Sequence, residues 1–143
     1  MKYDDASWHY EGDFPADLPP EAGATHIAMF VAWALLHGLS GELHAEDFPE
    51  TLAQLRQRTI SPGQFLIQAC DEKFTDKDLS DEGNAFAEHY FGLPGKSGAY
   101  LDDYDVTVGQ NGRSLYHVPD TWEIYDRLAP IIQKRFEQWR ANA

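Results

Sequence analysis

Cysteine and basic residues are scarce in this chain. It has one cysteine, Cys70, among 143 residues, which rules out an internal disulfide and any zinc site built from cysteines. Only 11 Lys and Arg residues stand against 24 Asp and Glu, so the formal net charge is −13. Because this charge repels phosphate backbones and anionic lipid headgroups, nucleic acids and membrane surfaces are disfavoured as partners.

Long hydrophobic runs and catalytic motifs are also lacking. The longest apolar stretch, residues 24–39, contains two histidines and is shorter than the roughly 20 apolar residues of a membrane-spanning helix. The first ten residues, MKYDDASWHY, have no export signal. There is no GxSxG, phosphate-binding loop, GxGxxG or HExxH. We therefore expect a soluble cytoplasmic protein, and the sequence predicts neither a cofactor nor a metal site.

The composition favours one folded domain over residues 1–143. Hydrophobic residues make up 43% of the chain and charged residues 24%, enough apolar surface for a core in a chain of single-domain size. Residues 11–23 contain three prolines and two glycines, which disfavour regular structure. Residues 1–22 are therefore predicted to form an extended arm packed on the body.

A buried central helix is predicted from about Ala22 to the residue before Gly38. Its apolar side chains occupy every helical angle instead of one stripe, which is typical of a helix surrounded by protein. His26 and His37 lie on its only polar line. A buried imidazole needs hydrogen-bond partners, so we interpret both histidines as structural.

The remaining helices are predicted from their caps and periodicity. They cover residues 49–58, 61–70, 80–91, 97–108 and 121–140, although 97–108 also shows some strand-like alternation. Residues 71–78 are predicted as a charged loop, 109–112 as a turn and 114–118 as a short extended piece. The predicted fold class is all-α, mainly helical: an irregular bundle of five to six helices around the central apolar helix.

Single residues offer little support for catalysis. Cys70 ends an apolar run on a predicted buried face, where a thiol keeps a high pKa, so we interpret it as a core residue. The acidic stretch after Cys70 lacks the spacing of a calcium-binding loop in either register. The acids of residues 102–105 are interpreted as a solvated turn.

Two segments combine acids with aromatic residues, at positions 3–10 and 100–105. Acids steer encounters with a cationic protein, and Trp or Tyr side chains supply buried anchors in interfaces. The first segment could equally tether the arm to the body. The residues predicted to bind a partner are Asp4, Asp5, Trp8, Asp102, Asp103, Tyr104 and Asp105.

Four segments also carry a family resemblance. They are KYDDASWH at 2–9, GATHI at 23–27, SLYHV at 114–118 and TWEIYDRLAPIIQKRF at 121–136. Together they resemble an uncharacterised family of small acidic bacterial domains, and the similarity extends along essentially the whole chain. Some such domains look like immunity proteins of polymorphic toxin systems. The resemblance implies no catalytic residues.

The sequence thus favours a cytoplasmic protein of the immunity type, which neutralises a basic partner such as a toxin domain. The alternative is a small enzyme or ligand-binding domain in which His9, His26 and His117 converge. A third class is a homo-oligomeric structural subunit that uses the aromatic last helix.

Overall fold

The computed structural model describes residues 1–142, and over these residues the fold is mainly helical, as predicted. The α-helices are α1 (Ala6–Tyr10), α2 (Thr25–Leu36), α3 (Leu43–Asp47), α4 (Pro49–Arg56), α5 (Pro62–Cys70), α6 (Asp81–Tyr90), α7 (Tyr100–Val108) and α8 (Trp122–Ala141). Three 3-10 helices, η1 (Pro20–Gly23), η2 (Asp76–Asp78) and η3 (Leu115–His117), connect them. The prediction of five to six helices was too low, because α1 and α3 have only five residues each and a helical period is not visible over so short a stretch.

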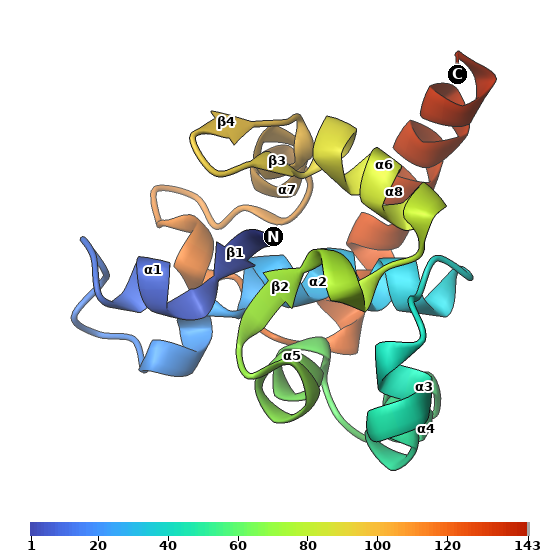
Figure 1. Cartoon of the computed structure of the whole chain (residues 1–143). Helices are drawn as coiled ribbons and strands as arrows, with labels where there is room; N and C mark the ends of the chain where they lie inside the picture. The colour runs from blue at the N-terminus through green and yellow to red at the C-terminus, as the bar shows by residue number, and fades with distance from the viewer. Residues whose placement is uncertain (143) are drawn as a thin grey trace.

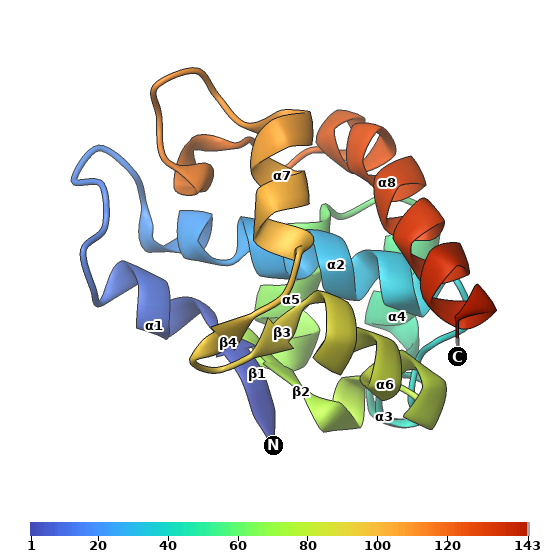
Figure 2. The same cartoon turned by 90° about the horizontal axis from the view of Figure 1, so that it is seen from above.

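Helix α2 forms the centre of the molecule. Every residue from Thr25 to Leu35 is buried, and α5 and α8 pack against the helix. Figure 1 shows α2 crossing the middle of the fold above α5, and Figure 2 shows α7 and α8 on another side of it. The prediction of a buried central helix is therefore confirmed.

The predicted helix starts are confirmed where a side-chain cap marks them. The hydroxyls of Ser61, Ser80 and Thr121 each accept a backbone N–H from the first turn of α5, α6 and α8. Asp120 links two of these starts, because its carboxylate accepts the Ser61 hydroxyl and the Gly63 N–H of α5 while Asp120 itself directly precedes the α8 cap. These contacts fix the ends of α5 and α8 relative to each other.

The N-terminal arm differs from its prediction as a wholly extended segment. Strand β1 (Lys2–Asp5) pairs antiparallel with β2 (Lys73–Thr75), and α1 follows directly. The buried Tyr3 ring lies 4.6 Å from that of Phe74. A strand forms only where a partner supplies hydrogen bonds, and this partner is some 70 residues away. The same pairing corrects the prediction of a loop over residues 71–78.

Two smaller segments also differ. Residues 115–117 form η3 instead of an extended piece. A short hairpin of β3 (Gly92–Leu93) and β4 (Lys96–Ser97) connects α6 to α7. The ambiguous segment at 97–108 contains α7, in which Tyr100, Tyr104 and Val108 are buried along one stripe.

The core is unusually rich in aromatic rings around α2. Phe30 is fully buried, and its ring centroid lies 5.3–6.3 Å from those of six neighbours. These neighbours come from α2, β2, α6, the residue between α6 and β3, and α7: Trp33, Phe74, Phe86, Tyr90, Phe91 and Tyr100. Phe30 therefore joins elements that are far apart in the sequence.

Phe30→Ala should lower the free energy of unfolding by about 3–5 kcal/mol, because it leaves a cavity among six rings. Val106→Ala is the control, since that side chain is 87% exposed and its truncation should cost less than about 0.5 kcal/mol. Urea unfolding followed by circular dichroism measures both values. A cost below about 1 kcal/mol for Phe30→Ala would contradict this description of the core.

Candidate functional site

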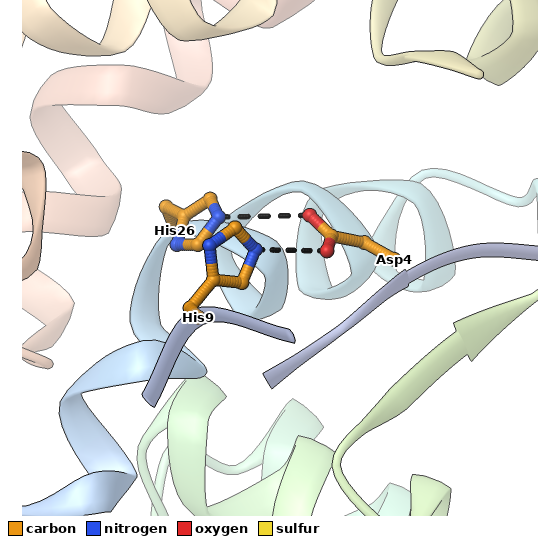
Figure 3. A group of neighbouring side chains, drawn as sticks. All are labelled: Asp4, His9 and His26. Atoms are coloured by element: carbon orange, nitrogen blue, oxygen red, sulfur yellow. Dashed lines mark hydrogen bonds and ion pairs between the residues drawn. The ribbon is translucent and has the colours of Figure 1, made fainter. Parts of the chain in front are cut away.

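Asp4, His9 and His26 form a compact polar cluster between β1, α1 and α2 (Figure 3). His9 Nε2 lies 2.8 Å from Asp4 Oδ1, and His26 Nε2 lies 3.6 Å from Asp4 Oδ2. The two imidazole rings meet edge to face at 4.5 Å. Both histidines therefore point a ring nitrogen towards the same carboxylate.

The local chain explains how His9 reaches Asp4. The Asp5 carboxylate accepts the Ser7 N–H and caps α1, so the chain passes from strand to helix without a loop. One turn of α1 then brings His9 back towards Asp4. His26 comes from the first turn of α2, which lies beside this strand-to-helix junction in Figure 3.

Neighbouring groups hold two members of the cluster in place. Asp4 Oδ1 also accepts the Asp5 backbone N–H at 2.8 Å, and Tyr116 Oη lies 2.7 Å from His9 Nδ1. A carboxylate can only accept, so His9 Nε2 donates to Asp4, and in the neutral imidazole Nδ1 accepts from the Tyr116 hydroxyl. Tyr116, His9 and Asp4 thus form a hydrogen-bonded chain.

His26 is the one member of the cluster that no neighbouring group holds in place, because neither of its ring nitrogens has a hydrogen-bond partner. The residue is only 1% exposed, and its 3.6 Å approach to Asp4 is too long for a hydrogen bond. Tyr104 Oη is likewise buried and without a partner, and the Tyr104 ring lies 6.3 Å from that of His26. Native structures rarely leave buried polar atoms in this state.

Burial and the mutual contacts set the charges of the cluster. Burial would raise the pKa of the Asp4 carboxyl, but the His26 and His9 imidazoles beside it outweigh that effect and hold the pKa well below its usual range. Burial lowers the pKa of His26, and Asp4 only partly opposes this shift. Near neutral pH the site therefore contains an ionised carboxylate and a neutral His26.

The predicted convergence of three histidines requires a correction. His9 and His26 do meet, but His117 lies outside the cluster. Its Nε2 is 3.1 Å from the exposed Asp17 and its Nδ1 is 3.0 Å from the Ser114 hydroxyl. The preceding residue, Tyr116, is the one that reaches His9, and which of two neighbours points inward cannot be read from a short turn.

The residues predicted to bind a partner divide into two groups. Asp5 and Tyr104 are buried, which corrects their prediction as partner-binding residues. Asp4 belongs to the cluster, and Asp103 pairs with Arg135 through two hydrogen bonds. Three of the seven are exposed: Trp8, at 48%, Asp102 and Asp105.

A groove of about 260 Å³ joins the two predicted segments. Asp4 and Trp8 line it from the N-terminal side, and Leu93 and Leu101 line it from the β3–β4 hairpin and α7. Strand β1 contacts β3, and in Figure 2 the β3–β4 hairpin lies beside β1 and leads into α7. Leu101 was not among the predicted partner-binding residues, although it lies within the segment 100–105.

A second buried cluster contains His44, Cys70 and Asp78. His44 Nε2 donates to Asp78 Oδ1 at 2.8 Å and lies 3.7 Å from the Cys70 sulfur. Asp78 also accepts the Thr75 N–H. Burial and the nearby Asp78 raise the pKa of the Cys70 thiol far above its usual range, as expected for a core cysteine. These contacts tie α3, α5 and η2 together.

A larger cavity lies elsewhere. It measures about 650 Å³ and is lined by residues of α6 and α8, including His89, Arg135 and Trp139. Arg135 is already paired with Asp103, and the cavity contains no group of convergent titratable side chains. We therefore place the candidate site at the Asp4 cluster and the adjoining groove.

Comparison with known proteins assigns the chain to a family without assigning an activity. Residues 2–118 match the family described as Domain of unknown function (DUF7832), so the chain belongs to that family. The matched range contains Asp4, His9, His26 and Tyr116. No curated protein and no solved structure matches the chain. Between residues 1 and 142, no helix is long and apolar enough to cross a membrane.

The lowered pKa of His26 predicts a pH-dependent stability. Below the ordinary pKa of 6.5 the unfolded chain binds a proton that the folded cluster resists, so the free energy of unfolding should fall as the pH drops. His26→Leu should flatten this decrease between pH 7 and 5, as measured by urea unfolding. Replacing the exposed His89 by Gln is the matched control and should leave the decrease intact. An unchanged slope in His26→Leu would contradict the prediction.

Proposed function

We propose that this domain is an acidic protein-binding module of the immunity type, which binds a basic protein such as a bacterial toxin domain. The observation that carries the proposal is the shared groove. The two acid-and-aromatic segments are about 90 residues apart in the chain, yet Trp8 and α7 lie at the same groove. Their proximity supports one continuous surface over two independent ones.

The outer face of α7 supplies the chemistry that such a surface needs. Leu101 is 38% exposed and Val106 is 87% exposed, and Asp102 and Asp105 lie between them in the sequence. Within residues 1–142 neither aspartate forms an ion pair. Apolar side chains flanked by free carboxylates suit a partner that presents an apolar residue among Lys or Arg side chains.

Trp8 provides an anchor on the other side of the groove. Its indole is half exposed, and the Lys2 ammonium lies 5.0 Å from the ring centroid, within the range of a cation–π contact. The net charge of −13 would accelerate the encounter with a cationic protein. Membership of a family of unknown function is compatible with this role but does not assign it.

The decisive test is a charge-reversal pair with a matched control. Asp102→Lys/Asp105→Lys should weaken binding of a basic partner by at least about tenfold, mainly through the association rate. Glu46→Lys/Asp47→Lys changes the net charge equally on α3, which lies away from α7 in Figure 1, and should leave affinity within about twofold. The partner is captured from extracts of the cell that encodes the chain, identified by mass spectrometry, purified and titrated by calorimetry at low and high salt.

Inhibition of a toxin is then tested by growth. Expression of the captured partner alone should arrest a bacterial host, co-expression of the wild-type chain should restore growth, and the α7 variant should restore it less. The proposal is overturned if the captured partner is acidic, if binding is independent of salt, or if both charge-reversed variants bind equally.

A further inference from the structure

We propose that Asp4, His9 and His26 bind one divalent transition-metal ion of the zinc class. The proposal does not depend on the protein-binding role, although Asp4 also lines the groove, and it revises the sequence prediction of no metal site. That prediction rested on the absence of two histidines at helical ligand spacing. The fold instead brings three ligands together from β1, α1 and α2.

The donor atoms are already close to the arrangement that a metal requires. One ligand atom from each residue lies within 4.8 Å of the others, and Asp4 is 2.8 Å from His9 Nε2 and 3.6 Å from His26 Nε2. Tetrahedral zinc with bonds of about 2.0–2.1 Å separates its ligand atoms by about 3.3 Å. Small side-chain shifts would therefore suffice.

The second observation is the state of His26. Its imidazole is 1% exposed, lacks any hydrogen-bond partner and turns Nε2 towards Asp4. A metal ion between His26 and Asp4 would give this nitrogen the partner that the protein does not supply. Burial also favours the neutral imidazole, which is the form that binds metals.

The surrounding groups fit the usual support of metal ligands. With His9 Nε2 bound to the ion, Nδ1 would carry the proton and donate it to Tyr116 Oη, 2.7 Å away. The Asp5 N–H already orients the Asp4 carboxylate. These contacts hold two of the three ligands before any ion binds.

The donor set selects the class of ion. Two imidazoles and one carboxylate suit zinc and other late first-row metals, whereas Mg²⁺ and Ca²⁺ prefer oxygen ligands. Three protein ligands also leave at least one position free for water or another ligand.

The His44–Cys70–Asp78 cluster is the weaker candidate. There the nitrogen that faces Cys70 and Asp78 is already hydrogen-bonded, and the atom without a partner is the opposite one, Nδ1. Asp78 has both of its oxygens in hydrogen bonds. The unpartnered Nδ1 of His44 thus faces away from Cys70 and Asp78, so it does not point to an ion between the three residues.

The test uses the full chain without a histidine tag, freed of metal with a chelator. Calorimetric titration with ZnCl₂ should give one site per chain with a Kd in the micromolar range or below, and Co²⁺ should give the intense visible absorption of a four-coordinate site. His9→Gln and Asp4→Asn should each weaken zinc binding by at least about 100-fold. MgCl₂ should give no binding. Circular dichroism confirms that both variants are folded.

Three control variants locate the site. Cys70→Ala, His89→Gln and Asp102→Lys/Asp105→Lys should all bind zinc like the wild type. The first removes the other cluster, the second an exposed histidine, and the third the proposed protein-binding face, so that either proposal can fail without the other. The assignment would be overturned if the wild type showed no stoichiometric zinc binding. It would also be overturned if folded His9→Gln retained that binding or if Cys70→Ala lost it.

Tyr116→Phe tests the supporting contact. Removing its hydroxyl should weaken zinc binding about 10–100-fold, because His9 loses the partner that orients its ring. The Co²⁺ spectrum should persist at saturating metal, since all three ligands remain. An affinity equal to that of the wild type would show that Tyr116 does not position His9.

Discussion

The pairing of β1 with β2 is the interaction on which the candidate site depends. It holds the N-terminal segment against the helical body, with Tyr3 packed on Phe74. The Asp5 cap then turns the chain into α1, so that His9 lies beside Asp4 and over the start of α2. Without this strand pair neither the polar cluster nor the N-terminal wall of the groove would have a defined position.

The position of His26 is a second constraint. The most apolar helix of the protein carries, in its first turn, an imidazole that no protein group satisfies. The chain surrounds it with aromatic rings and one carboxylate rather than with hydrogen-bond partners. Such an arrangement disfavours a purely structural histidine, because a packed hydrocarbon side chain would fill the same space without the cost of burying two polar nitrogens.

Local signals in the sequence predicted the helical fold well. The caps at Ser61 and Ser80 depend on residues within one turn and are confirmed. For the last helix the sequence left Asp120 and Thr121 as alternatives, and Thr121 is the cap. The stacking of Phe86 on Tyr90 also follows from helical spacing. Helices α1 and α3 escaped prediction because five residues are too few to display a period.

Non-local features could not be predicted in the same way. The partner of β1 is far along the chain, and an alternating pattern of four residues does not identify it. The histidine cluster was anticipated in part, since His9 and His26 meet, while Asp4 takes the place assigned to His117. Tyr104 could have been excluded from the surface, because Tyr100, Tyr104 and Val108 share a helical stripe and Asp102 and Asp105 do not.

The distance in sequence between β1 and β2 also constrains how the protein is made. During synthesis the first strand leaves the ribosome well before its partner, and Tyr116 follows later still. Until residues 73–75 emerge, β1 has unsatisfied backbone hydrogen-bonding groups, which in a nascent chain invite pairing with other strands. The acidic residues at positions 4 and 5 would discourage such pairing between copies. Strand β1 can therefore reach its native structure only after residues 73–75, some 70 residues further along the chain, have been translated.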